Sequence, residues 1–268
     1  MSTALAALRE RLAAGGPAFG AWSTLGSPLP PEILAQLGFD YVCVDLQHGL
    51  ATLGSAPPAL QGIAAAGSAP LVRVPGNEPW LIMRALDLGA SGVVVPLVST
   101  PDEAQRAARA CRYPPAGDRS WGPVRTAPGL GATAEERNEL VLCIAMIETV
   151  EGVASLEAIC GTPGIDAVYV GPSDLGLSHG LAPGAELDDV IARIARISTE
   201  CGVPAGIHTR SGAAARAAIE TGYAFATVSS DRDLLARSAR TELAAALGKE
   251  PESRPATDAD LPRASASY

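Results

Sequence analysis

Short apolar runs alternate along the chain with segments of helical periodicity, and Gly or Pro residues bound most of the runs. Eight of the runs predict β-strands, near residues 18–25, 41–47, 70–75, 92–98, 140–148, 167–171, 204–208 and 225–230. Between them, apolar residues recur at helical spacing, for example in residues 31–37, 78–88, 102–111 and 211–221. Because strand and helix alternate eight times, the pattern predicts an α/β fold, a single-domain (β/α)8 TIM barrel.

The predicted strands are apolar on both faces, as a parallel sheet covered by helices requires, most clearly in residues 41–45 and 92–98. With 268 residues, 47% of them hydrophobic, the chain is long enough for one sizeable core. We therefore predict one catalytic barrel over residues 1–248 and a polar, flexible tail over residues 249–268. We predict that residues 112–140 form a long irregular segment. In a compact domain such a segment is usually functional or disordered.

Charge and cysteine content narrow the possible partners. A net charge of −9 argues against a nucleic-acid-binding surface, which needs clustered Lys and Arg. No run approaches the ~20 apolar residues of a membrane helix, and no segment has the pattern of a secretory signal, so no membrane partner is expected. The five cysteines are odd in number and well separated, which disfavours a disulfide framework and indicates a reducing cytoplasm. Small molecules are the expected partners.

Polar side chains follow the predicted strands at the points where these strands end. In α/β barrels the carboxyl ends of the strands meet at one face, and this face carries the reacting groups. Six residues lie at such ends: Trp22, Asp45, His48, Arg73, Glu148 and Asp174. We therefore expect an active site of acidic, basic and aromatic side chains at this mouth of the barrel.

Glu148 and Asp174 are the candidate metal ligands. Each follows an otherwise apolar strand, and burying a carboxylate is costly unless a cation or a hydrogen-bond donor meets it. Two carboxylates from adjacent strands can hold one divalent ion and leave coordination positions for substrate and water. The alternative is that each carboxylate caps the next helix or pairs with an Arg.

Arg73 lies in an apolar strand, and its planar guanidinium suits a carboxylate or an enolate oxygen. A buried ion pair with Asp45 is the alternative, and both interpretations can hold together. His48 follows Asp45 by three residues, near enough for the carboxylate to orient or charge an imidazole used in acid–base catalysis. His208, at the end of the seventh predicted strand, is a second candidate.

Five segments of the chain carry motifs in a fixed order, namely Gly38–His48, Leu71–Pro75, Tyr113–Gly117, Ile147–Thr149 and Val170–Leu175. In this order and at similar separations they resemble motifs of the HpcH/HpaI family of class II pyruvate aldolases, and the match spans most of the chain. The resemblance implies a barrel whose last helix is exchanged between subunits and a homo-oligomer built as a trimer-based hexamer. It also implies a divalent cation such as Mg²⁺, Mn²⁺ or Co²⁺ as cofactor.

The resemblance assigns roles to residues at the mouth. Glu148 and Asp174 match the metal ligands, and Arg73 matches the residue that holds the pyruvate carbonyl or enolate oxygen. Asp45 and His48 match the acid–base pair near the metal-bound water.

Further assignments follow from the same resemblance. Asp87 matches a carboxylate that reaches a His of a neighbouring subunit, and Trp22 matches an aromatic residue that lines the pocket. The backbone amides of Ser173 and Asp174 match the donors to the substrate carboxylate. Met146 is a departure, because better-known members carry Gln at this position, and it widens the range of reactions that the resemblance implies.

The predicted function is that of a metal-dependent carbon–carbon lyase, similar to 4-hydroxy-2-oxoheptanedioate aldolases, acting on 2-oxo acid and aldehyde substrates through a pyruvate enolate. A Lys Schiff base is excluded as the electron sink because Lys249, the only Lys, lies beyond the last predicted strand. His48, directly or through metal-bound water, is predicted to remove the C4 hydroxyl proton, while metal and Arg73 hold the enolate. Oxaloacetate decarboxylation and synthase-type condensation are alternatives that use the same enolate. A catalytically silent barrel is the remaining alternative.

Overall fold

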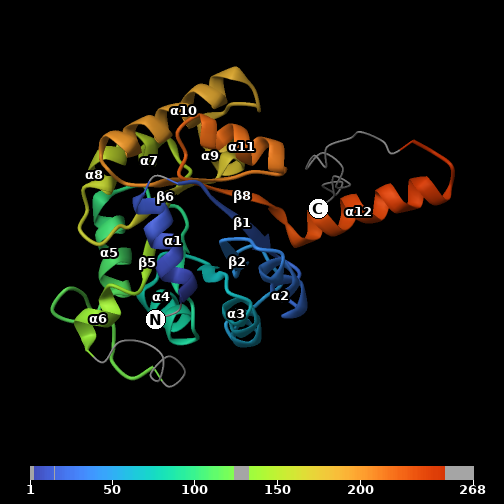
Figure 1. Ribbon diagram of the computed structural model, residues 1–268. Coiled ribbons are helices and arrows are strands. Elements are labelled where there is room, and N and C mark those ends of the chain that lie inside the picture. Colours follow the sequence, from blue (N-terminus) through green and yellow to red (C-terminus); the bar gives the residue numbers. More distant parts are fainter. Residues whose placement is uncertain (1–2, 15, 124–132, 251–268) are drawn as a thin grey trace, which may run out of the picture. The chain divides into compact units, whose positions relative to one another are not determined.

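The computed structural model describes residues 3–14, 16–123 and 133–250, and the chain divides into two compact units (Figure 1). The first unit, Met1–Asp231, contains all the strands, and the second, Arg232–Tyr268, begins within the last helix. The predicted boundary at residue 248 stays a prediction, and most of the predicted tail, residues 251–268, lies outside the described residues.

Eight parallel strands close into a barrel in which each strand pairs with the next and the last pairs with the first. The strands are β1 Ala18–Ser23, β2 Tyr41–Asp45, β3 Ala69–Arg73, β4 Gly92–Val95, β5 Leu142–Ile147, β6 Ala167–Val170, β7 Ala205–His208 and β8 Phe225–Ser230. The predicted fold class is therefore confirmed, with all eight strands near their predicted positions. Their arrangement places the eight carboxyl ends at one mouth.

Several strands end earlier than predicted, and the sequence at those ends explains why. Pro96 follows β4 directly, and a proline has no N–H to continue the ladder. β2 stops at Asp45 because the Asp45 carboxylate accepts the backbone N–H groups of Gln47 and His48, which turns the chain out of the sheet. The strands are thus shortened on the side of the mouth, where the loops begin.

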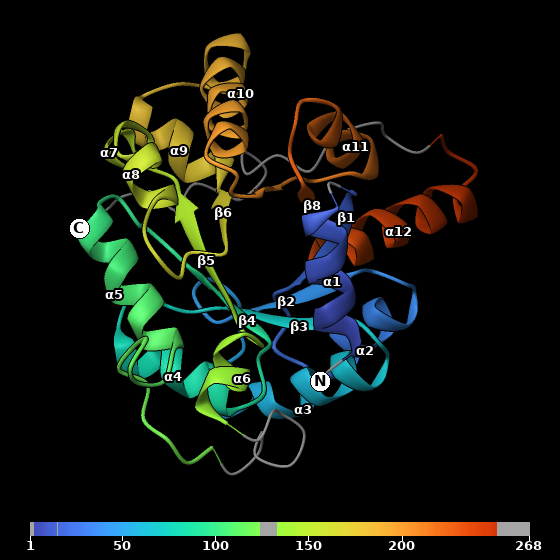
Figure 2. The same ribbon diagram turned by 60° about the vertical axis from the view of Figure 1, so that its left-hand side comes forward.

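The helices of the first unit lie outside the ring of strands, as the two ribbon views show (Figures 1 and 2). They are α1 Thr3–Ala13, α2 Leu29–Gln36, α3 Ala56–Ala65, α4 Pro79–Asp87, α5 Pro101–Cys111, α6 Ala134–Asn138, α7 Val150–Ala154, α8 Leu156–Cys160, α9 Pro172–His179, α10 Ala185–Glu200 and α11 Gly212–Glu220. The helix α12 spans Asp231–Ala246. The segment predicted to be irregular, residues 112–140, contains α6, and its residues 124–132 lie outside the described part of the chain.

The interior of the barrel is filled by side chains. The aromatic rings of Tyr41 and Phe225 occupy space that Gly20 and Gly206 leave open, since a Cβ at either glycine would lie about 2 Å from ring atoms. The hydroxyl group of Tyr41 lies 3.0 Å from that of Thr227, inside the core. At the amino ends of the strands, α1 adds buried leucines to the same core cluster. The interior is thus a packed core, and in barrels of this kind the reaction site lies at the carboxyl mouth.

Within the described residues, no helix is both long and apolar enough to cross a membrane.

Candidate functional site

An ion pair between β2 and β3 forms one side of the mouth. Arg73 Nε donates to Asp45 Oδ1 at 2.9 Å, and Arg73 Nη2 donates to Asp45 Oδ2 at 2.6 Å. The two side chains are only 11% and 1% exposed, so the pair is well shielded from water. The buried ion pair between Arg73 and Asp45, which was one of the two interpretations of Arg73, is therefore present. A guanidinium has five N–H groups, and the pair uses two of them, which leaves donors for a substrate oxygen.

The charge state of Asp45 follows from this pairing. Burial alone would raise the pKa of the Asp45 carboxyl, but the hydrogen bonds and the charge of Arg73 outweigh burial and hold the pKa below its ordinary value. The backbone N–H groups of Gln47 and His48 act in the same direction. Asp45 is thus an anion that fixes Arg73 at the mouth.

His48 is exposed at the start of the loop after β2. Its backbone N–H donates to Asp45 Oδ1 at 3.3 Å, while Arg73 meets both carboxylate oxygens of Asp45. Asp45 thereby holds the backbone at His48 in place. The acid–base role of this pair remains a prediction.

Glu148 follows β5 directly and is 2% exposed. Its Oε1 accepts the backbone N–H of Leu97 at 2.8 Å, whereas Oε2 is buried and has no hydrogen-bond partner among the described residues. Burial raises the pKa of Glu148 to about 7; the Leu97 N–H and the charge of Arg73 oppose this rise, and the charge of Asp174 adds to it. A buried carboxylate oxygen without a donor fits a site for a cation.

Gly171 makes room for Glu148. A Cβ at Gly171 would lie 2.6 Å from Glu148 Oε2 and 2.9 Å from Met146 Cε, so only glycine fits beside the carboxylate. In the part of the chain that the structure describes, no group of three or more His, Cys, Asp or Glu side chains could hold a metal ion. The fit to a cation therefore rests on the two carboxylates Glu148 and Asp174, which were the two predicted ligands.

The first turn of α9 brings Ser173 and Asp174 to the mouth beside Glu148. Gly171 is the N-cap and has no side chain to cap the helix. Helix geometry leaves the N–H groups of Ser173 and Asp174 without an intrahelical acceptor, and these groups attract anions. The turn thus combines one carboxylate with two donors, and the predicted roles of these residues stay predictions.

Trp22 links the ion pair to the aromatic core. Its ring stacks on Tyr169 with a centroid distance of 5.5 Å, and the Arg73 guanidinium lies 5.3 Å from its centroid. His208, the second candidate histidine, lies edge-on to the same ring at 5.2 Å. Trp22 is buried, so it supports Arg73 from the barrel interior.

Asp87 does not lie at the carboxyl mouth of the barrel in its own chain. It is the last residue of α4, which returns from the carboxyl end of β3 to the amino end of β4. Its carboxylate accepts a 2.8 Å hydrogen bond from Arg119 Nη2, and the Arg119 guanidinium lies 4.6 Å from the Tyr113 ring. The predicted role of Asp87, at a histidine of another subunit, stays a prediction.

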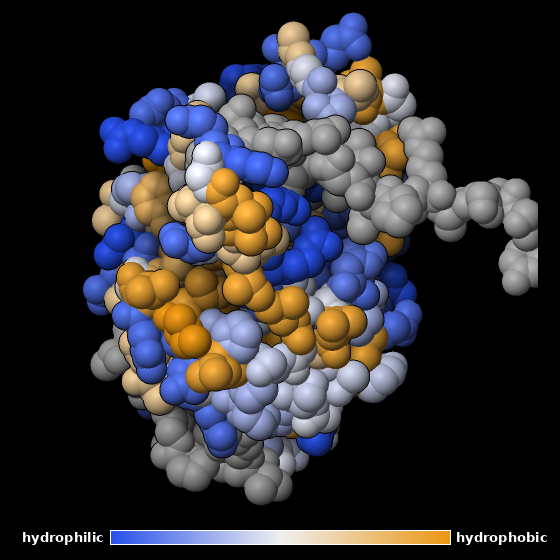
Figure 3. Space-filling view, turned by 90° about the vertical axis from the view of Figure 1, so that its right-hand side faces the viewer, coloured by the Kyte–Doolittle hydropathy of each residue, from blue (hydrophilic) through white to orange (hydrophobic). Residues whose placement is uncertain are grey.

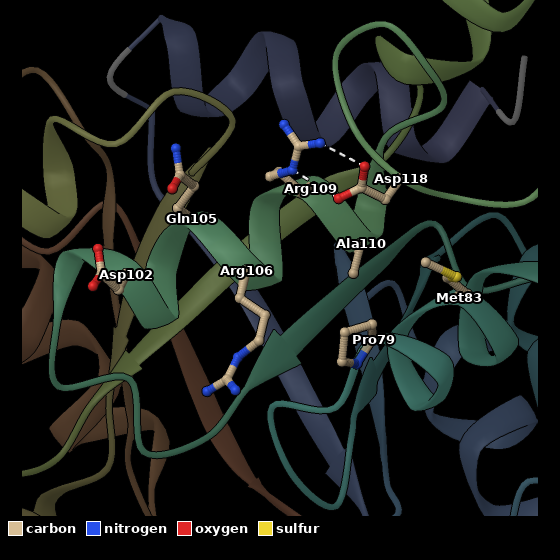
Figure 4. A pocket seen from close by; sticks show the side chains of 8 residues that line it. All are labelled: Pro79, Met83, Asp102, Gln105, Arg106, Arg109, Ala110 and Asp118. Carbon is tan, nitrogen blue, oxygen red and sulfur yellow. Dashed lines mark hydrogen bonds and ion pairs between the residues drawn. The ribbon is translucent and has the colours of Figure 1, made fainter.

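A hollow on the outside of the barrel lies between α4 and α5 (Figure 4). Arg109 and Asp118 pair across one side of it, with Arg109 Nε 2.7 Å from Asp118 Oδ2, and Arg106 lies away from this pair. None of the predicted site residues lines this hollow.

Two residues that matter at the mouth were missed or undervalued from the sequence. Leu97 acts through its backbone N–H, which leaves no side-chain signal. No role was predicted for Gly171 itself, although a glycine directly after an apolar strand signals close approach of another group.

A family model described as HpcH/HpaI aldolase/citrate lyase matches residues 18–245. A hydroxypyruvate/pyruvate aldolase of Rhizorhabdus wittichii is 38% identical over 236 residues, which cover 86% of this chain and 94% of the relative. A 5-keto-4-deoxy-D-glucarate aldolase of Escherichia coli is 36% identical, with coverage of 88% and 94%. The crystal structure of an HpcH/HpaI aldolase/citrate lyase family protein from Burkholderia cenocepacia matches with a TM-score of 0.83 at 36% identity, covering 90% of this chain and 99% of that one.

Proposed function

Because the chain belongs to the HpcH/HpaI aldolase/citrate lyase family, we propose that it cleaves or forms 4-hydroxy-2-oxo acids with the help of one divalent cation at Glu148 and Asp174. Its relatives are aldolases, and the chain is accordingly an enzyme of the carbon–carbon lyase class. The observation that carries the cation site is Glu148 Oε2, a buried carboxylate oxygen with no donor among the described residues.

Glu148 and Asp174 would hold the cation, and Gly171 leaves the space next to Glu148. A bound divalent cation supplies a Lewis acid for the negative charge that develops on the 2-oxo acid. The family resemblance includes Mg²⁺, Mn²⁺ and Co²⁺, and oxygen ligands suit Mg²⁺ and Mn²⁺ well. No Lys is available to replace this chemistry, since Lys249 follows the end of α12.

In the cleavage direction, His48 takes the proton of the C4 hydroxyl group and the C3–C4 bond breaks. The electron pair of that bond moves toward the carbonyl oxygen, where the free N–H groups of Arg73 donate to the growing negative charge. The backbone N–H groups of Ser173 and Asp174 hold the substrate carboxylate. Proton transfer to C3 then yields pyruvate, and the aldehyde is the second product.

We also propose a homo-oligomer in the cytoplasm. Exposed apolar side chains support the oligomer: the space-filling view shows a band of them on one face (Figure 3), and α2 alone exposes Leu29 and Ile33. The helix α12, taken by itself, exposes Leu235 and Leu243. These exposed leucines suit the exchange of the last helix between subunits that the family resemblance implies. The cytoplasmic location rests on the cysteines, all five of which are free thiols.

The test is a coupled assay of pyruvate release from 4-hydroxy-2-oxo acids, with oxaloacetate in parallel, using protein stripped with a chelator. We expect no turnover in stripped protein and recovery on addition of Mg²⁺, Mn²⁺ or Co²⁺. Full turnover in metal-free protein would refute the cation site. Turnover of oxaloacetate alone would select the decarboxylase alternative. Borohydride with pyruvate should leave the intact mass unchanged, because no barrel Lys forms a Schiff base.

A further inference from the structure

Leu97 has a backbone conformation that a leucine rarely adopts. It lies two residues after β4 with φ of 55°, and it is the only non-glycine residue with positive φ among the described residues. Left-handed φ values crowd the Cβ of an L-residue and are normally left to glycine or asparagine. The Leu97 side chain is 53% exposed, so side-chain burial does not account for the strain.

The chain directly after Leu97 is anchored to β5 and to Thr149, the N-cap of α7. The backbone N–H of Val98 donates to the carbonyl oxygen of Met146 at 3.2 Å, and the hydroxyl groups of Ser99 and Thr149 lie 2.7 Å apart. These contacts fix where the loop crosses the carboxyl end of β5. The turn at Leu97 is therefore held by the surrounding structure, as strained residues at functional sites are.

The left-handed turn directs one group into the site. The backbone N–H of Leu97 donates to Glu148 Oε1 at 2.8 Å, and this is the hydrogen bond that the structure gives to the Glu148 carboxylate. With Oε1 fixed in this way, Oε2 is left beside Gly171.

We propose that Leu97 is a positioning residue for the cation site, acting through its left-handed backbone and not through its side chain. Its N–H holds one oxygen of Glu148 so that the other is presented to the cation. The inference rests on the proposed role of Glu148 as a metal ligand. It goes further because it assigns the position of the Glu148 carboxylate to the backbone conformation of a loop residue.

Substitutions that differ in their tolerance of positive φ separate the backbone role from a side-chain role. Leu97→Asn and Leu97→Gly accept the left-handed conformation, whereas Leu97→Val and Leu97→Ile, being β-branched, resist it. By calorimetric titration with Mn²⁺, we expect the dissociation constant to rise about 10–100-fold in the Val and Ile variants, the usual effect of losing a partner of a metal ligand. The Asn and Gly variants should stay within about threefold of the parent, because the N–H to Glu148 is kept.

Leu37→Val is the matched control, because Leu37 is also exposed and has an ordinary φ of −80°. It should bind Mn²⁺ like the parent protein, and all variants are first checked by circular dichroism for the native fold. Two outcomes would overturn the proposal. Weak Mn²⁺ binding in the Asn and Gly variants with normal binding in the Val and Ile variants would assign the effect to the Leu97 side chain. Equal Mn²⁺ binding in all four variants would show that the Leu97 backbone conformation has no role in the site.

A measurement on metal-free protein separates this inference from the cation site itself. Hydrogen exchange at the Leu97 amide should be slow in the parent protein and much faster in Glu148→Ala, while the Val98 amide, bonded to Met146, stays unchanged. If Mn²⁺ does not bind the parent protein at all, the proposed cation site fails. If the Leu97 amide exchanges equally fast in both proteins, the positioning role fails.

Discussion

Replacing Gly171 by Ala tests whether the space beside Glu148 is required. The backbone at Gly171 has φ of −100° and ψ of 92°, which an alanine adopts without strain. The substitution therefore acts only through the added methyl group. That group would lie 2.6 Å from Glu148 Oε2 and 2.9 Å from Met146 Cε.

The size of the effect follows from these distances. Ordinary contacts of a Cβ begin at 3.4 Å, so the carboxylate oxygen has to move by about 0.8 Å and the methionine methyl by about 0.5 Å (3.4 minus 2.6 and 3.4 minus 2.9). Met146 is flexible and can adjust, but Glu148 is buried and held by the Leu97 N–H. We expect a loss of about 1–3 kcal/mol in the free energy of unfolding, the usual cost of overpacking. Because Glu148 moves, the dissociation constant for Mn²⁺ should rise about 10–100-fold.

Calorimetric titration with Mn²⁺ and chemical unfolding of the metal-free protein measure the two effects. Gly212→Ala is the control, since Gly212 is exposed at the start of α11 and the nearest atom to its Cβ position is 4.0 Å away. It should bind Mn²⁺ normally and be at least as stable as the parent, because alanine favours helix. If Gly171→Ala binds Mn²⁺ as tightly as Gly212→Ala, the carboxylate does not need its present position and the reasoning is refuted.

Four further substitutions separate the roles at the mouth. Glu148→Ala should lose Mn²⁺ binding, whereas Arg73→Ala should bind Mn²⁺ and lose rate; an Arg73→Ala protein that loses its metal but keeps full rate when reloaded would reverse the two roles. His48→Ala should slow aldol cleavage by about 10²–10⁴-fold and slow oxaloacetate decarboxylation much less, because loss of CO₂ needs no hydroxyl proton removed; an equal loss in both assays would move the base elsewhere. Asp45→Asn should destabilise the protein at pH 7 by about 3–5 kcal/mol, because it leaves Arg73 buried without its partner. The pKa of Asp45 is lowered by folding, so the pair stabilises fully above about pH 4 and the difference in unfolding free energy should shrink as the pH falls below that value; a difference independent of pH would contradict the ion pair.

The fold could be predicted because its signal is local and repeated. Each strand is a short apolar run, and the run at residues 225–230 gave both strand limits correctly. Loops that are held by distant contacts could not be predicted in the same way. The segment after α5 is fixed by Asn138, whose side chain accepts the N–H of Tyr113 at 2.7 Å and donates to its carbonyl oxygen at 3.1 Å. Tyr113 and Asn138 are 25 positions apart in the sequence, and the sequence around either residue does not indicate a contact with the other.

The charged residues of the site could be predicted because a charge at the end of an apolar strand needs a partner. Asp45 and Arg73 stand at the ends of neighbouring strands, and the structure pairs them. The position of the Glu148 carboxylate could not be predicted from the sequence. It depends on the backbone N–H of Leu97 and on the absence of a side chain at Gly171. Neither feature belongs to a residue type associated with catalysis.

The charges at the mouth support the proposed divalent cation. Asp45 and Arg73 neutralise each other through two hydrogen bonds, so neither contributes net charge to the site. Glu148 and Asp174 then remain, and together their ionised forms carry two negative charges. A divalent cation balances these charges, whereas a monovalent cation would leave one carboxylate uncompensated in a buried position. With the proposed cation bound, the anionic 2-oxo acid would meet no excess negative charge and could reach the donors of Arg73 and the first turn of α9.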